Sequence, residues 1–209
     1  MTEIEKLQEI VKDIDETLED KDTVRELAMK SSRAIRRISK NVIQDIHRSK
    51  EIDHPLKEAQ KEIHKLKSII EDHPELYHSG FLRNGLQEYA EAHILLSLSE
   101  GEKPKSPEEL DITPSSYLLG LADVVGELRR MILDELTEGD VERAKELHEK
   151  MEVIKNMIMD FDYPNAIVPI RNKQDMARNL VEKTRGDITS SVRSEKLMDK
   201  MDKIIEEID

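Results

Sequence analysis

Four acidic side chains, arranged in two pairs at helical spacing, are the groups of this sequence best suited to chemistry. Glu88 and Glu91 form one pair, and Asp123 and Glu127 form the other, so a helix would carry each pair on one face. Two such helices could assemble a cage of four carboxylates around a hard divalent cation, most naturally Mg2+ or Mn2+. A cation held there would neutralise a scissile phosphate and lower the pKa of an attacking water. The pattern therefore predicts a metal site in which all four residues are ligands.

The segment around the first pair is expected to be buried on more than one side. Between residues 81 and 98, one stripe contains Leu82, Leu86, Tyr89, Ala90 and His93, and a second contains Phe81, Asn84, Glu88, Glu91, Leu95 and Leu98. A helix that is apolar nearly all round lies inside a protein or at a subunit contact, which would place both glutamates in a low dielectric. Like charges there are costly unless a cation joins them. An exposed polar helix face is the alternative for either pair.

The absence of a Glu-x-x-His motif and of cysteine narrows the choice of metal. His93 follows Glu91 at a distance of two positions, so the Glu-x-x-His motif of di-iron helix bundles is absent. The sequence contains 0 Cys, which excludes thiolate metal sites, disulfides and a thiol nucleophile. Iron is therefore disfavoured, and any catalysis must depend on carboxylates, histidines and hydroxyls.

A basic stripe is predicted on the helix over residues 32–50. Its apolar side carries Ile35, Ile38, Val42, Ile46 and Ser49, and the opposite side carries Arg33, Arg36, Arg37, Lys40, His47 and Arg48. The net charge of -13 argues against a protein coated in nucleic acid, so an RNA backbone needs a local basic surface of this kind. The alternative is a solvated face with internal ion pairs. With 3% aromatic residues, phosphate contacts with little base readout are expected.

The elements that position these groups are expected to be helices throughout. The composition is 37% hydrophobic and 38% charged, with 7 Gly, 7 Pro, 2 Phe and no Trp, which suits amphipathic helices and not a β-sheet. Core stripes at helical spacing recur at residues 4–18, 56–70, 144–158 and 197–208. We predict a single all-α domain over residues 1–209, a bundle of about seven or eight helices.

Helix starts and stops divide this bundle. Good N-cap residues are Asp22, Thr113 and Asp140. Stops are expected at Asp53-His54-Pro55, His73-Pro74, Gly139-Asp140, Tyr163-Pro164 and Arg185-Gly186-Asp187, with a long polar connection from about Ser99 to Ile112. No stretch has the roughly 20 apolar residues of a membrane span, and no signal peptide is apparent, so a soluble cytoplasmic protein is expected.

Three segments resemble the translin and translin-associated factor X family. Residues 85–92 (GLQEYAEA) resemble the helix of translin-associated factor X that carries its first two catalytic glutamates. Residues 112–130 (ITPSSYLLGLADVVGELRR) are similar to the signature helix in which an aspartate and the following glutamate complete the metal site. The segment from Tyr163 to Gly186 resembles the terminal helices of the family, so the resemblance spans most of the chain.

The resemblance implies a translin-like fold and an endonuclease that acts on single-stranded RNA, with sites facing the inside of a hollow, octamer-like shell. Single-stranded DNA is expected as a further binding partner. In eukaryotes the partner subunit is translin, which binds without cutting. Because Glu88, Glu91, Asp123 and Glu127 are all present, the chain resembles the catalytic branch, and a prokaryotic homolog that assembles with itself is expected. The resemblance assigns RNA binding to Arg33, Arg36, Arg37, Lys40 and Arg48 more loosely.

Two other functions are compatible with the same residues. An all-α nucleoside triphosphate pyrophosphohydrolase would also use helical carboxylates and Mg2+ on a phosphate substrate, but its small pocket needs no extended basic stripe. A non-catalytic single-stranded nucleic-acid-binding shell would use the stripe and keep the carboxylates for structure.

Overall fold

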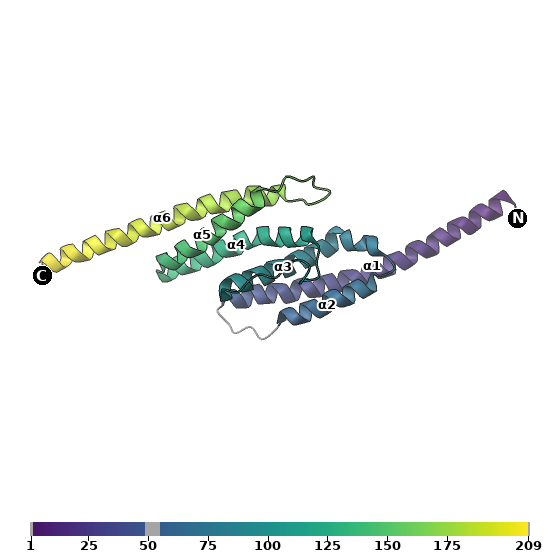
Figure 1. Ribbon diagram of the computed structural model, residues 1–209, viewed down its shortest axis with the longest axis horizontal. Helices are drawn as coiled ribbons and strands as arrows, with labels where there is room; N and C mark the ends of the chain where they lie inside the picture. The colour runs from purple at the N-terminus through teal and green to yellow at the C-terminus, as the bar shows by residue number, and fades with distance from the viewer. Residues whose placement is uncertain (1, 49–54, 209) are drawn as a thin grey trace. The chain divides into compact units, whose positions relative to one another are not determined.

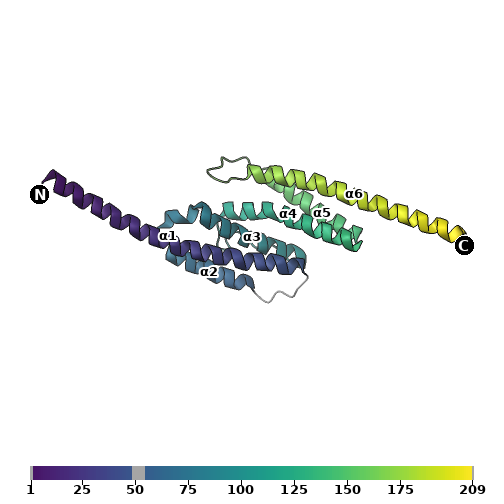
Figure 2. The same cartoon turned by 180° about the vertical axis from the view of Figure 1, so that it is seen from behind.

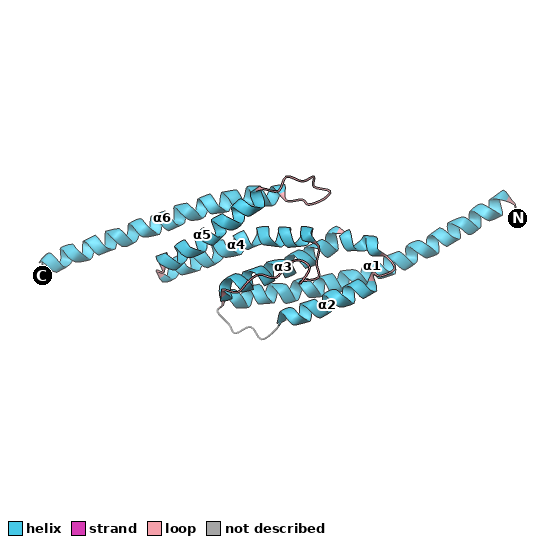
Figure 3. Cartoon of the chain, viewed as in Figure 1, coloured by secondary structure: helices cyan, strands magenta, loops and turns pink. Residues whose placement is uncertain are grey.

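The computed structural model describes residues 2–48 and 55–208, and all regular structure in these ranges is helical (Figures 1 and 3). The elements are α1 (Glu3–His47), α2 (Pro55–Ile69), the 3-10 helix η1 (Pro74–His78), α3 (Gly80–Glu100), α4 (Pro114–Glu138), α5 (Val141–Met159) and α6 (Arg171–Ile208). The all-α prediction is confirmed. The number of α-helices in the described ranges is six, slightly below the predicted seven or eight, because two of them are unusually long.

Polar side chains cap several helices at their starts, as the sequence indicates. Thr2 and Glu5 form a capping box in which each side chain accepts a hydrogen bond from the other's backbone N–H. The Thr113 side chain accepts from the backbone N–H of Ser116 at 3.1 Å, and Asp140 accepts from that of Arg143 at 2.8 Å. The predicted starts at Thr113 and Asp140 are therefore confirmed, since these bonds satisfy otherwise unpaired N–H groups.

Two predicted helix boundaries are wrong. Asp22 does not begin a helix but lies inside α1, a 45-residue helix without glycine or proline, where its carboxylate pairs with Arg25 at 2.9 Å. The predicted stop at Arg185-Gly186-Asp187 lies inside α6. One glycine costs a helix only about 1 kcal/mol relative to alanine. Nearby tertiary contacts offset that cost, because Arg129 of α4 donates to Thr184 at 2.6 Å and pairs with Asp187 at 2.9 Å. Within Asp53-His54-Pro55, the first two residues lie outside the described ranges, and α2 begins at Pro55.

The chain divides into two compact units. The first contains Met1–His93 and Lys105–Ser116, and the second contains Ile94–Pro104 and Tyr117–Asp209. In the first unit α1 lies beside α2, and in the second α5 lies beside α6 (Figures 1 and 2). The predicted stripes over 56–70 and 144–158 are buried in these cores, as expected. A single domain over residues 1–209 stays a prediction.

The apolar stripe at the start of α1 does not belong to the core that the sequence predicts. Ile4, Leu7, Val11, Ile14 and Leu18 are 52–65% exposed. In α6, Leu197, Met201 and Ile204 are 54–59% exposed. Both predictions of core stripes are therefore corrected, because each helix end extends beyond the packed residues of its own unit. None of the described helices has both the length and the apolar character needed to cross a membrane.

A close approach of two backbones anchors α3 against α1. A Cβ placed on Gly85 would lie 2.6 Å from Ser32 Oγ and 2.9 Å from the Ser32 carbonyl oxygen. The Ser32 hydroxyl donates to the Phe81 carbonyl at 2.8 Å, which fixes its position. The absence of a side chain at Gly85 therefore sets the distance between the helix that carries Glu88 and the helix that carries the basic stripe.

Gly85→Ala is expected to destabilise the protein by about 1–3 kcal/mol, because the added methyl group must displace backbone as well as a hydroxyl. Gly186→Ala is the matched control, since a Cβ at Gly186 meets no atom within 4 Å. Gly186→Ala should stabilise the protein by up to about 1 kcal/mol, because alanine has a higher helix propensity than glycine. Urea unfolding followed by circular dichroism measures both. Equal shifts for the two variants would contradict the close approach.

Candidate active site

The first carboxylate pair lies in a helix segment with no exposed residue from Gly85 to Ser99. The Glu88 side chain is 19% exposed, and Glu91 as a residue is 7% exposed. This confirms the expectation that α3 is buried nearly all round. Two acidic groups one turn apart in such surroundings need positive charge nearby, since burial disfavours ionised carboxylates.

Part of that positive charge comes from the basic stripe of α1. Arg36 Nε lies 3.4 Å from Glu88 Oε2, and Lys40 Nζ lies 3.8 Å from Oε1 of the same carboxylate. The two cationic side chains remain about half exposed, at 53% and 48%. A phosphate at these groups would therefore lie directly beside one of the predicted metal ligands.

The rest of the basic stripe has the geometry that the sequence predicts. Arg33, Arg36, Arg37, Lys40 and Arg48 are exposed, whereas Ile35, Val42 and Ile46 on the opposite side of α1 are buried. Ser49 and Lys50 lie outside the described residues. RNA binding by the stripe stays a prediction.

The second carboxylate pair lies on α4 and has its own cationic neighbour. Asp123 forms an ion pair with Lys173 near the start of α6, and the two side chains are 25% and 24% exposed. Glu127 follows one turn later and is half-buried. Sequence reasoning did not single out Lys173. The sequence does contain a signal for this pairing. The first turn of α6 carries Arg171 and Lys173 but no acidic residue. Because the helix dipole disfavours cations at a helix start, these side chains need acidic partners elsewhere.

His93 and Tyr89 stand beside the first pair as neutral groups. Burial, followed by the positive charge of Lys105, lowers the pKa of His93 to about 4. Burial and the negative charge of Asp111 raise the pKa of Tyr89 to about 12. The two rings meet edge to face, and His93 Nε2 lies 3.2 Å from the Tyr89 hydroxyl oxygen. Near neutral pH, His93 therefore offers no positive charge for a phosphate.

The donor chemistry suits a hard divalent cation. All four predicted ligands are carboxylates, and Glu88 and Asp123 each attract cationic side chains. Within the described ranges, no group of three or more acidic or histidine side chains is arranged to hold a metal ion. Glu88 and Glu91 belong to the first unit, and Asp123 and Glu127 belong to the second. The relative positions of the units are not determined, so the four-carboxylate cage stays a prediction.

The all-helical fold is that of a translin-like protein. A model of the Translin family matches residues 2–185, and the chain belongs to this family. The uncharacterized protein MJ0175 of Methanocaldococcus jannaschii is 36% identical over 191 residues, which cover 90% of this chain and 85% of that protein.

Solved structures share the fold. The chain is similar to the crystal structure of AfC3PO, with 30% identity, a TM-score of 0.69 and coverage of 88% of this chain and 97% of that one. The structure of an AfC3PO–duplex RNA complex matches with 29% identity, a TM-score of 0.68 and the same coverage. Apo-NeC3PO, at 23% identity with a TM-score of 0.70, covers 91% of this chain and 98% of its own, and supports the fold alone.

Lys173→Met tests whether Asp123 is a metal ligand. The change removes an ammonium group that competes for the carboxylate. The metal-free protein should lose about 1 kcal/mol of stability, as expected for a partly buried ion pair. Mn2+ should bind about 3- to 10-fold more tightly, because a positive charge beside the ligand is gone. Calorimetry in EDTA and Mn2+ titration followed by electron paramagnetic resonance measure the two effects.

Lys183→Met is the matched control, since Lys183 is an exposed lysine of the same helix. It should leave Mn2+ affinity unchanged. If Lys173→Met also leaves Mn2+ affinity unchanged, Asp123 is not a ligand.

Proposed function

We propose that the protein is a Mg2+- or Mn2+-dependent endoribonuclease that cleaves single-stranded RNA inside a self-assembled shell. The observation that carries the proposal is the ion pairing of Glu88 with Arg36 and Lys40. This ion pairing places a surface suited to an RNA backbone beside a carboxylate suited to bind a metal ion. A structural ion pair alone would not require the row of further exposed cations along α1.

Similarity to AfC3PO supports RNA as the ligand. The structure of that protein has been solved in a complex with duplex RNA, and the protein is about 30% identical to this chain. The basic stripe makes the same kind of ligand suitable here, since phosphate contacts do not depend on base sequence. The preference for single strands rests on the family resemblance, so it has to be tested against a duplex.

The proposed mechanism assigns separate tasks to the two carboxylate pairs and the stripe. Glu88, Glu91 and Asp123 would hold the divalent cation, which would supply charge stabilisation for the phosphate and make the attacking water more acidic. Glu127 would orient that water and accept its proton. When RNA binds, Arg36 and Lys40 release the Glu88 carboxylate and pair with phosphate oxygens instead. These contacts hold the RNA strand in place.

Self-association is part of the proposal. Its support is the large apolar surface that α1 and α6 leave exposed, including Ile4, Val11 and Met201. Apolar surface of this extent in a charged protein is typical of a subunit contact.

A non-catalytic RNA-binding shell is the second candidate. It is favoured by one observation, namely that Glu88 and Asp123 already have cationic side chains as partners, which is sufficient for purely structural carboxylates. Labelled single-stranded RNA, duplex RNA and a nucleoside triphosphate, each with Mg2+, Mn2+ or EDTA, separate the candidates. Metal-dependent cutting of the single strand supports the proposal, binding without cutting supports the shell, and hydrolysis of the nucleotide alone supports a pyrophosphohydrolase.

Glu127→Gln is expected to lower the rate of RNA cleavage by about 10²-fold or more. The amide keeps the size of the side chain but cannot accept a proton from water, and losses of this size are usual for a general base. Folding and assembly should be unchanged. Glu142→Gln is the control, because its side chain is 83% exposed and outside the proposed site. Full activity of Glu127→Gln in a single-turnover cleavage assay would remove its catalytic assignment.

Arg36→Ala is expected to weaken RNA binding and reduce its dependence on salt by about one phosphate contact. Binding is measured in EDTA by fluorescence anisotropy over a range of salt concentrations, so that effects on metal binding do not interfere. Lys61→Ala, an exposed lysine of α2, is the control for loss of one positive charge. Identical affinities and salt slopes for Arg36→Ala and the unmodified protein would show that the stripe does not bind RNA.

A further inference from the structure

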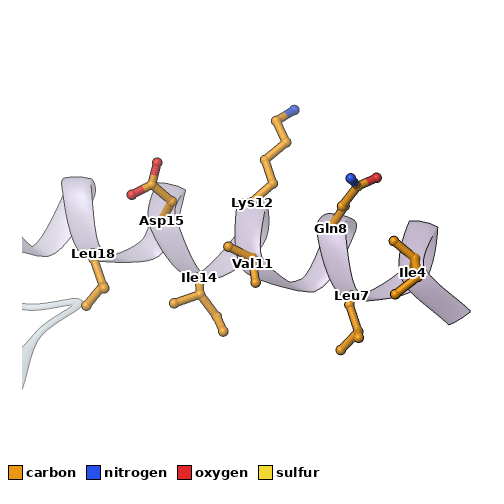
Figure 4. A pocket seen from close by; sticks show the side chains of 8 residues that line it. All are labelled: Ile4, Leu7, Gln8, Val11, Lys12, Ile14, Asp15 and Leu18. Atoms are coloured by element: carbon orange, nitrogen blue, oxygen red, sulfur yellow. The ribbon is translucent and has the colours of Figure 1, made fainter.

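A groove in the second unit has the size of a small-molecule site. Its volume is about 640 Å³, within the range of roughly 300–1,000 Å³ that is usual for such sites. The lining comes from the end of α3, the connection that follows it, the start of α4 and one side of α5. All of these segments belong to the same compact unit. The apolar surface at the start of α1 differs, because its lining residues all come from one helix (Figure 4).

The floor of the groove is apolar and held in place by the core. Ile94 of α3 and Ile154 of α5 line the groove and are 2% and 6% exposed. Leu98 and Leu121 continue the apolar lining and are half-buried. A site whose floor is already packed does not have to be ordered when a ligand binds, so contact with an apolar ligand is favourable.

The groove is elongated along α5 and differs between its two ends. Its α5 residues run from Glu146 to Met157, which spans about 16 Å at 1.5 Å per residue. Glu146 and Glu149 lie toward one end, whereas Val153 and Met157 lie toward the other and are 51% and 52% exposed. The shape therefore suits an elongated ligand with a polar head and an apolar body that covers these two side chains.

The charges at the acidic end favour a cationic head. Glu146 pairs with Arg143 at 2.8 Å, whereas no ion pair within the described residues involves Glu149. Lys150 is the cationic residue of the lining, but it donates to the Leu98 carbonyl at 3.3 Å. That carbonyl lies in the last turn of α3, where the helix dipole is negative, so Lys150 compensates the helix end. The charge that remains for a ligand is the Glu149 carboxylate, and its complement is a cation.

We propose that this groove binds an elongated apolar molecule with a protonated amine at one end. The amine pairs with Glu149, and the apolar body lies along Leu121 and Ile154 toward Met157. None of the four predicted metal ligands lines the groove. Binding there therefore requires neither RNA nor a metal ion and is a property beyond the proposed nuclease activity.

Decylamine, decanol and decanoate test the site, because they share one apolar chain and differ in the charge of the head group near neutral pH. The protein contains no Trp, so Met157→Trp at the edge of the groove introduces a single indole whose fluorescence reports binding. Decylamine should bind saturably, with one molecule per protein chain. Its affinity should exceed that of decanoate by about tenfold, because one head attracts and the other repels Glu149.

Glu149→Gln, made in the reporter protein, should weaken decylamine binding by about 2- to 5-fold, the effect expected of one exposed charge pair. Decanol binding should stay unchanged, since decanol has no charge. Glu182→Gln is the matched control, because Glu182 is an exposed carboxylate of α6 outside the groove. It should change neither affinity.

Val153→Arg should weaken the binding of decylamine and decanol by about tenfold or more. Its long side chain fills part of the groove, and its guanidinium lies one helical turn after Glu149, where it pairs with the carboxylate. Circular dichroism verifies that each variant keeps its helical content.

A second reporter measures general attraction of decylamine to this acidic protein, whose net charge is -13. Lys183→Trp places the indole on an exposed position of α6 outside the groove and should show no saturable change. Equal responses of the two reporters would mean adsorption to the acidic surface and would overturn the site.

Three further results would overturn the proposal. Tighter binding of decanoate than of decylamine would make Lys150 the anchor and an anion the ligand. Equal affinities of all three probes would show that Glu149 does not select the head group. Absence of saturable binding by any probe would show that the groove takes no ligand of this kind. The RNA cleavage assay decides the proposed function separately from all of these measurements.

Discussion

Placing acidic side chains in the buried helix α3 imposes a need for positive charge that shapes the candidate site. Glu91 is 7% exposed, and Glu88 lies in the same buried stretch. Removing a carboxylate from water is expensive unless a cation compensates it. In this protein α1 supplies cations to Glu88 through Arg36 and Lys40. The spacing of α1 and α3 therefore matters to chemistry as well as to packing, and that spacing depends on Gly85 against Ser32.

Charge is distributed unevenly along α1, and this reconciles a net charge of -13 with a surface suited to nucleic acid. The second half of the helix carries the basic stripe, whereas the first half carries acidic side chains around an apolar stripe. Electrostatic attraction of a phosphate backbone is local, because ions in solution screen charges beyond about 10 Å at ordinary ionic strength. The same helix can therefore present one surface suited to nucleic acid and another suited to a protein contact.

The Translin family fold gives a physical context for the two long helices. Residues 2–185 match the family, and α1 and α6 each continue well past the packed part of their units. A helix of such length is not stabilised by propensity alone, so its exposed apolar ends need tertiary or quaternary contacts. The proposed self-association would supply those contacts and at the same time bury the surface that otherwise faces water.

The sequence by itself determined the all-α fold, the helix starts at Thr113 and Asp140, and the sides of α1 that carry apolar and basic residues. These features depend on periodicity and on hydrogen bonds between near neighbours along the chain. It did not determine that α1 and α6 run through Asp22 and Gly186, because contacts such as Arg129 with Asp187 come from distant segments. Nor could it show that the stripe at Ile4–Leu18 is exposed, since periodicity identifies an apolar face but not what covers it. Only the tertiary structure brought Arg36 to Glu88 and Lys173 to Asp123, because ion pairs between helices depend on how those helices pack.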